Sequence, residues 1–279
     1  MKALSTLFLA IFIAFSVNSQ SLFFRISDNG LKHPVYIFGT IHVFPASKFF
    51  IHDIVLDKLR KSEKLVLEID LSDANLMLEI IPFMAMQGKT LSDLVTLEEF
   101  ELLNRFYTDS LEMPFGFMVK IKPLLVSSMM IPYMIGEQIV SYEDYLKNKA
   151  KSLGIPVGGL ETIEEQIGYI DRISLKDQAR LLVEQVRDIV KTRSTLKEMF
   201  GLYLLNDAQV LYDFVTEHSA EIREFSQYLL AERNQNWISQ IIKLGSEQPT
   251  FVAIGAGHLG GERGVINLLK QAGYMVEPL

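Results

Sequence analysis

The first part of the chain alternates short apolar runs with turn residues, and this pattern predicts a β-rich unit. Two β-type runs, 22–26 and 34–38, flank the turn residues 28–30, in which an Asn-Gly step accepts positive φ angles. Apolar residues at helical spacing follow over 51–61, and a third β-type run occupies 64–71. The order strand, loop, helix, strand is therefore expected for the segment that begins at the second run.

A similar order is expected at the end of the chain. An apolar strand over 250–254 precedes a glycine-rich loop over 255–261, and a helix over 264–272 leads to a last strand over 274–276. Two related β-loop-α-β units in one chain predict an α/β fold with a mixed central β-sheet.

The middle of the chain is predicted to be mainly helical. A buried strand over 155–160 interrupts it, whereas 174–244 contains no proline and no β-type run. We therefore expect one domain over 20–279, with a large helical insertion at about 73–150 and 174–244. Helices are expected here over 91–107 and 142–153, and several more within 174–244. The first of them contains the Thr96…Glu99 capping pattern.

The first 19 residues are predicted to be a signal peptide rather than part of the fold. Lys2 gives a positive start, 3–17 is almost wholly apolar, and 17–19 offers small residues where a signal peptidase cleaves. The alternative is an uncleaved membrane anchor, but the apolar run is shorter than the ~20 residues needed to span a bilayer. We expect an exported protein, in a bacterial periplasm or secreted, with no stable membrane span after cleavage.

The amino-acid composition limits which partners and which kinds of site the protein can have. The chain has 27 Lys and Arg against 34 Asp and Glu, a formal net charge of −7, which argues against nucleic acid as a partner. It contains no cysteine, so disulfides, thiolate metal sites and cysteine nucleophiles are excluded. Any bound metal would need His, Asp or Glu ligands.

A Gly-x-x-His pattern occurs twice, at Gly39…His42 and Gly255…His258, each time directly after an apolar strand. Ligands of α/β sheets bind beyond the carboxyl ends of strands, where glycine allows close approach of the backbone. Two imidazoles that converge there would suit a metal ion, or a base and its partner. The alternative is that each histidine only caps a strand end.

Two carboxylates lie at matching places in the predicted strands. Glu68 is flanked by apolar residues in 64–71, and a buried carboxylate there needs a cation, a metal ion or a retained proton. Glu161 closes the run 155–160, although it could simply begin an acidic first helical turn. Asp70 and Glu164 are further candidates, and a solvated edge strand is the alternative for Glu68.

These motifs together resemble the TraB/GumN family, which is similar to the Tiki metalloproteases and, more distantly, to ChaN-like and erythromycin-esterase-like folds. The resemblance extends over essentially the whole chain after the signal peptide. The segments that support it are YIFGTIHV (36–43), LVLEID (65–70), Lys-Pro at 122–123, GGLET (158–162), ERNQNWISQI (232–241) and FVAIGAGHLGGERGVINLLKQAGYMVEP (251–278).

The resemblance implies roles for particular residues. His42 and His258 stand where Tiki proteins place metal-binding histidines, with Glu68 and Glu161 as nearby acids, and Arg233 matches a basic position of the family. It implies a ChaN/erythromycin-esterase-like fold and a metal-dependent hydrolase, without fixing a substrate.

The function expected from these observations is a metal-dependent hydrolase of the cell envelope that acts on a peptide or protein. His42, His258 and Glu161 would hold a divalent zinc, cobalt or manganese ion. Glu68 would accept a proton from the attacking water and Arg233 would stabilise the oxyanion, while Glu161 could exchange roles with Glu68. The alternative is a non-catalytic envelope protein that binds a peptide signal through the same pocket.

Export gives the first testable prediction. If residues 1–19 are a cleaved signal, mass spectrometry of the protein from the envelope fraction should find Gln20 or a close neighbour at the N-terminus. Recovery of intact Met1 from membranes would show an anchor instead.

Overall fold

A computed structural model of the chain describes residues 21–72 and 76–279. The expected signal peptide therefore lies outside the described residues, as do the first residues of the expected helical insertion. Within the described ranges, no helix combines the length and the apolar character needed to cross a membrane.

The described strands form a mixed central sheet, which confirms the expected α/β class. Its order is β6-β4-β7-β2-β1-β8. The strands β6, β4, β7 and β2 run parallel, whereas β1 is antiparallel to both of its neighbours. The bounds are β1 Phe23–Ser27, β2 Val35–Thr40, β4 Lys64–Leu67, β6 Val157–Gly159, β7 Thr250–Gly255 and β8 Met275–Pro278.

The two predicted units meet at the centre of this sheet. β2 pairs with β7 in parallel, with Gly39 opposite Ile254 and Thr40 opposite Gly255. Both strands are buried along almost their whole length, which is typical of parallel strands covered on both faces. The two Gly-x-x-His loops therefore leave the same edge of the sheet side by side.

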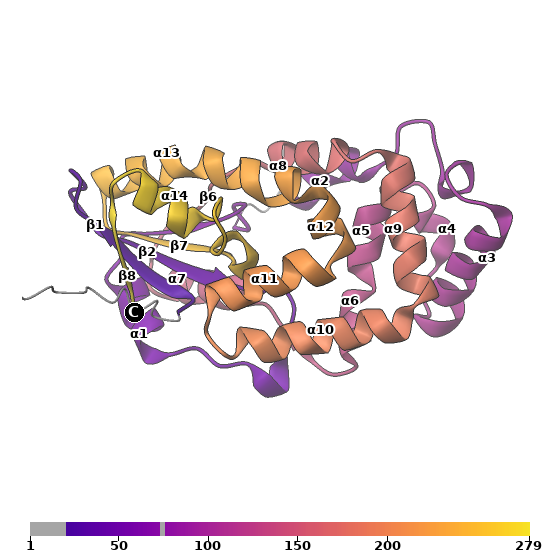
Figure 1. The fold of residues 1–279 in the computed structure, drawn as a ribbon, viewed down its shortest axis with the longest axis horizontal. Helices are drawn as coiled ribbons and strands as arrows, with labels where there is room; N and C mark the ends of the chain where they lie inside the picture. The colour runs from indigo at the N-terminus through magenta and orange to yellow at the C-terminus, as the bar shows by residue number, and fades with distance from the viewer. Residues whose placement is uncertain (1–20, 73–75) are drawn as a thin grey trace, which may run out of the picture.

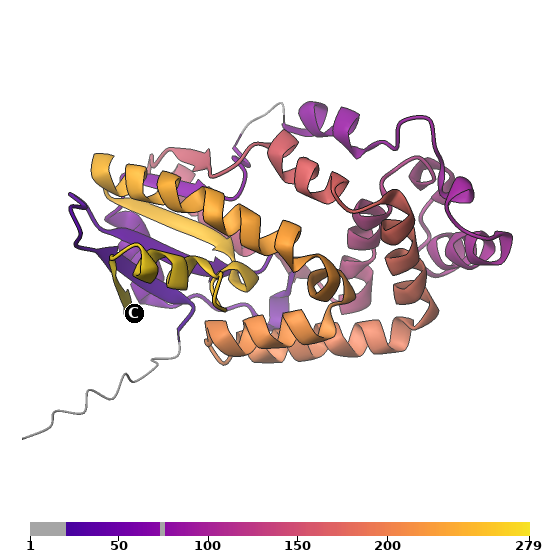
Figure 2. The same cartoon turned by 45° about the horizontal axis from the view of Figure 1, so that its top comes forward.

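Helices cover both faces of the sheet (Figures 1 and 2). The helices α13 (Glu232–Glu247) and α14 (Val265–Gln271) pack together on one face, and α1 (Asp53–Arg60) and α7 (Tyr142–Ser152) lie on the other. Trp237 and Ile241 of α13 belong to the same buried cluster as the sheet residues. This cluster is the first hydrophobic core.

A second hydrophobic core lies in the helical part, which extends from the sheet to the far end of the molecule (Figure 1). Tyr107, Val126 and Leu182 are among its fully buried side chains. A short two-stranded sheet pairs β3 (Phe44–Pro45) with β5 (Ile139–Val140). The remaining α-helices in the described ranges are α2 (Leu76–Met84), α3 (Leu97–Arg105), α4 (Phe115–Met118), α5 (Pro123–Met129), α6 (Ile131–Ile135), α8 (Ile163–Asp171), α9 (Leu175–Arg187), α10 (Ile189–Tyr203), α11 (Ala208–His218) and α12 (Ala220–Ser226).

Two expected elements are shorter than the sequence pattern indicated. The helix expected over 91–107 begins only at Leu97, because the capping box formed by Thr96 and Glu99 starts a helix at that point. The strand expected over 64–71 ends at Leu67. Glu68 therefore lies just beyond the strand, and because β4 is an inner strand, the solvated-edge alternative for Glu68 is wrong.

The contact between α13 and β2 gives a prediction for stability. A Cβ atom at Gly245 would lie 2.4 Å from Leu31 Cδ2 and 2.7 Å from Val35 Cγ2. Overpacking of this kind costs about 1–3 kcal/mol, so Gly245→Ala should lower the free energy of unfolding despite the better helix propensity of alanine.

Gly201 of α10 is the matched control, because nothing beyond its chain neighbours and its own helix backbone lies within 4 Å of its Cβ position. Gly201→Ala should raise the free energy of unfolding by up to about 1 kcal/mol. Urea unfolding followed by circular dichroism measures both variants. Equal effects of the two changes would contradict the close packing of α13 on β2.

Candidate active site at the carboxyl ends of the central strands

The structure gathers four of the five predicted site residues into one buried cluster. Glu68 follows β4, Glu161 lies two residues after β6, Arg233 is in the first turn of α13, and His258 ends the short 3₁₀ turn after β7. The exposed fractions of Glu68, Arg233 and His258 are 6%, 8% and 5%. The carboxyl ends of three parallel strands thus meet one helix.

Arg233 is the centre of the cluster. Its Nη2 donates to Glu68 Oε2 at 2.5 Å and to Glu161 Oε1 at 2.6 Å, and its Nε donates to Glu161 Oε1 at 3.0 Å. Its Nη1 lies 3.2 Å from His258 Nε2. One guanidinium therefore contacts both predicted carboxylates and one predicted histidine.

The two carboxylates also accept hydrogen bonds from neutral donors. Gly255 N donates to Glu68 Oε1 at 2.8 Å, and Trp237 Nε1 donates to Glu161 Oε2 at 3.2 Å. The amide of Gln166 bridges both carboxylates, at 3.3 Å from Glu68 and 3.0 Å from Glu161. All of these partners donate, as ionised carboxylates require.

The pKa values of the two carboxylates shift in opposite directions. Burial favours the neutral form of Glu68, but the charge of Arg233, attraction from the His258 and His42 rings, and the Gly255 N–H outweigh it and hold the pKa well below the usual carboxyl range. Burial and the negative charge of Glu68 raise the pKa of Glu161, although Arg233 opposes this shift. One guanidinium thus balances only one of the two negative charges, because burial keeps His258 neutral.

Burial and the charge of Arg233 lower the pKa of His258 to about 3. Its Nδ1 lies 2.6 Å from Asn234 Oδ1, and the Asn234 amide nitrogen donates to the Arg263 carbonyl at 2.8 Å. The proton of the neutral imidazole is therefore on Nδ1, and the lone pair is on Nε2.

His42 lies apart from the cluster described above, on the loop after β2. Its Nδ1 is 2.9 Å from Glu143 Oε1, and 64% of its side-chain surface is accessible. Burial disfavours the charged ring, but the hydrogen bond and charge of Glu143 outweigh it and raise the pKa of His42 to about 9. The negative charge of Glu68 also raises the pKa of His42, and the charge of His42 lowers the pKa of Glu68.

Glu143 and Asn234 were missed by sequence reasoning. Glu143 lies in the first turn of α7, where acidic residues are common because they stabilise the helix terminus, and this pattern hides its contact with His42. It is only 3% exposed and also accepts hydrogen bonds from Thr40 and Ser141. For Asn234 the sequence offered one indication of a functional role, which is its position next to Arg233 in the ERNQNW segment.

The structure explains both glycines of the Gly-x-x-His pattern. A Cβ atom at Gly39 would lie 2.6 Å from Leu259 Cδ1 and 3.1 Å from Ala256 Cβ, so the first loop packs directly on the second. A Cβ atom at Gly255 would lie 3.1 Å from Glu68 Oε1. In both places glycine allows a close approach that another side chain would block.

The donor atoms fit a divalent ion by their chemistry. His258 Nε2 and Glu68 Oε1 are 3.8 Å apart, and two ligands of one tetrahedral zinc ion are separated by roughly 3.4 Å. Among residues 21–72 and 76–279, however, no three His, Asp or Glu side chains are arranged to hold an ion. The role of Glu161 as a ligand and the shared His42–His258 site stay predictions.

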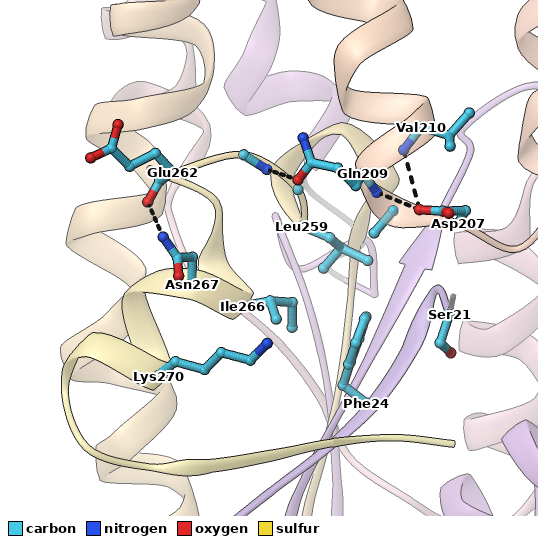
Figure 3. Close-up of a pocket in the computed structure, with 13 residues that line it drawn as sticks. Ser21, Phe24, Asp207, Gln209, Val210, Leu259, Glu262, Ile266, Asn267 and Lys270 are labelled. Carbon is cyan, nitrogen blue, oxygen red and sulfur yellow. Dashed lines mark hydrogen bonds between the residues drawn. The ribbon is translucent and has the colours of Figure 1, made fainter. Parts of the chain in front are cut away.

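A cavity of about 640 Å³ borders the cluster at Glu161. The further candidates Asp70 and Glu164 line it, together with the apolar Phe83 of α2. Another cavity, of about 510 Å³, lies beside the glycine-rich loop, and Figure 3 shows the Lys270 side chain extending toward Ile266 and Phe24, which also line it. None of the predicted site residues lines this second cavity, so the chemistry is expected on the Glu161 side.

Comparison with known proteins identifies the family. The sequence model of the TraB/PrgY/gumN family matches residues 22–278. The chain belongs to the TraB/PrgY/gumN family. The resemblance drawn from the sequence motifs is thereby confirmed, and no solved structure matches the chain.

Two relatives of this TraB/PrgY/gumN protein have names that state an activity. "Metalloprotease TIKI2" of Xenopus tropicalis is 25% identical over 305 residues, and "Metalloprotease TIKI homolog" of Amphimedon queenslandica is 26% identical over 304 residues. Each match covers 88% of this chain but only 57% and 59% of the respective relative. The chain thus spans less than two thirds of the length of these relatives.

The position of Arg233 gives a prediction. Arg233→Met leaves two buried carboxylates without their cation, and breaking a buried ion pair in this way costs about 3–5 kcal/mol. Urea unfolding of the protein, treated with a chelator, should show a loss of this size. Replacing Glu68 and Glu161 by Gln in the same variant should recover part of it, because neutral amides need no cation. A loss below about 1 kcal/mol for Arg233→Met would contradict the neutralising role.

Proposed function

We propose that this TraB/PrgY/gumN protein is an exported metal-dependent hydrolase that cleaves peptide or protein substrates. The observation that supports this most strongly is the buried cluster of Glu68, Glu161, Arg233 and His258. When both carboxylates are ionised and His258 is neutral, the cluster has one negative charge more than Arg233 balances, and the raised pKa of Glu161 reflects this excess. A bound cation would compensate that charge, and the names of the two Tiki relatives agree with a metal ion.

In this proposal His258, His42 and Glu68 would hold the ion, which requires them to come closer together than in this structure, where no three such side chains of the described residues are arranged to hold one. His258 would offer Nε2, which in this structure accepts from Arg233 Nη1 at 3.2 Å. His42, whose pKa is raised to about 9, would have to lose the Nε2 proton to bind the ion, while Nδ1 stays engaged with Glu143. Glu68 Oε1 is the carboxylate oxygen that lies 3.8 Å from His258 Nε2. Zinc, cobalt or manganese bound there would lower the pKa of a bound water, so that hydroxide is available near neutral pH.

Arg233 supplies positive charge beside the reacting carbonyl. Its Nη1 faces His258, so a substrate carbonyl near His258 would lie within the field of the guanidinium, which stabilises a developing oxyanion. Glu161, which accepts hydrogen bonds from both Nε and Nη2, holds the guanidinium in this orientation. This arrangement favours Glu68 over Glu161 as the carboxylate nearest to the ion.

Metal content and hydrolysis test the proposal together. Purified protein is loaded with Mn²⁺, Co²⁺ or Zn²⁺, and bound metal is measured by mass spectrometry. Fluorescein-labelled casein and a quenched random-peptide library are the substrates. We expect a roughly stoichiometric ion that His258→Ala loses, and a decrease in hydrolysis of at least about 10²-fold in Glu68→Gln. Glu277→Gln, on an exposed edge strand, is the control and should keep both properties.

The two roles considered for Glu68 give different results. As a ligand, Glu68→Gln weakens metal binding as well as hydrolysis, whereas as a proton acceptor it loses hydrolysis and keeps the ion. Folded protein that binds none of the three ions and cleaves neither substrate would overturn the proposal. It would favour the non-catalytic peptide-binding protein.

A further inference from the structure

The two histidines of the repeated pattern share a feature that the pattern itself does not contain. In each, Nδ1 is hydrogen-bonded to an oxygen of a buried side chain from another element, Glu143 of α7 for His42 and Asn234 of α13 for His258. These oxygens are 2.9 Å and 2.6 Å from the ring nitrogens. In both rings Nε2 is the remaining nitrogen, and in His258 it accepts a hydrogen bond from Arg233 Nη1 at 3.2 Å.

The Asn234 contact fixes both the orientation and the tautomer of His258. The Asn234 amide nitrogen donates to the Arg263 carbonyl, so its oxygen must face the ring and accept. Asn234 is 2% exposed, so this contact is buried. A His258 ring with its proton on Nε2 would direct that proton at the donor Arg233 and leave Asn234 facing a lone pair.

Glu143 orients His42 in the same way, but the acceptor is a charged carboxylate. The carboxylate is 3% exposed, and Thr40 and Ser141 donate to it in addition to His42. Thr40 is the last residue of β2, so the carboxylate connects the strand end, the histidine loop and α7. The His42 ring is otherwise open to solvent, and Glu143 is the buried anchor that sets its direction.

We propose that Glu143 and Asn234 are the positioning residues of the two Gly-x-x-His loops, each holding the Nδ1–H of its histidine so that Nε2 is presented to the site. Neither residue touches the substrate or the ion; each acts through its histidine. This assignment deepens the proposed function, since the presented Nε2 atoms are the proposed metal donors. Metal-binding histidines generally need such a partner on their other ring nitrogen.

The first test needs no metal and no activity. Long-range ¹H–¹⁵N NMR of the metal-free protein locates the imidazole protons. In the wild type, His258 should have its proton on Nδ1, and the Nδ1 proton of His42 should exchange slowly. Asn234→Leu and Glu143→Leu should each lose the signal of their own histidine only. The conservative variants Asn234→Asp and Glu143→Gln keep an acceptor and should retain it.

Matched controls lie close by in the sequence. Asn236 is exposed on the same helix as Asn234, and Asp144 follows Glu143 with its side chain 57% exposed. Asn236→Leu and Asp144→Asn should leave both imidazole signals unchanged. If a Leu variant does not fold, the Asp and Gln variants decide. The assignment would be overturned if His258 of the wild type has its proton on Nε2. It would also be overturned if the imidazole signals persist in the Leu variants, or if they are lost in Asn234→Asp and Glu143→Gln.

The second test measures metal affinity by calorimetry with Mn²⁺, Co²⁺ and Zn²⁺. Loss of a partner that orients a metal-binding histidine typically weakens affinity by about 10–100-fold, and we expect this for Asn234→Leu and Glu143→Leu. Unchanged affinity in both would overturn the positioning role. If the wild type binds none of these ions, the proposed function fails, and the NMR result alone decides whether Glu143 and Asn234 orient the rings.

Discussion

The arrangement of the site depends on a single buried guanidinium. Arg233 lies where the ends of β4 and β6 approach α13, and it is the cation that allows two carboxylates to be buried side by side. Without it, Glu68 and Glu161 would repel each other in a region with little water to screen them. The contact also joins the helix to the sheet, so the same ion pairs that shape the chemistry fix the position of α13 over the strand ends.

A second constraint is the close approach of the two histidine loops. Because β2 and β7 are parallel neighbours in register, the residues that follow them start side by side. Gly39 then packs on Ala256 and Leu259, and Tyr203 of α10 donates a hydrogen bond to the Gly39 carbonyl at 2.8 Å. The helices α10 and α7 thus contribute to the site through Tyr203 and Glu143, and both helices pack on the first core.

Much of the fold was accessible from the sequence, because local patterns determine it. The strands around Ile37 and Val252 and the helices between 174 and 244 follow from apolar spacing alone. The buried position of Glu68 also followed from its apolar neighbours. The end of β4 was less predictable, because the residues after Leu67 continue the apolar alternation without pairing.

The contacts within the site could not be derived in the same way, because they join residues that are far apart in the sequence. Arg233 and Glu68 are 165 positions apart, and nothing local indicates that a single guanidinium would contact both Glu68 and Glu161. Glu143 is hidden for a different reason, since an acidic first turn of a helix is common on the surface. Patterns indicate that a residue needs a partner, whereas the topology determines which partner it finds.

The turn that leads into α13 sets how much variation in length this protein can tolerate. Gln227–Ala231 is a π-helical turn, and the next residues to pair with the site, Arg233 and Asn234, are adjacent on the helix that follows. Each residue added or removed in that turn would rotate the helix by about 100° relative to its anchor in the first core. A change of one residue would therefore move both Arg233 and Asn234 away from their partners. Insertions and deletions among relatives should therefore be absent between Gln227 and Asn234.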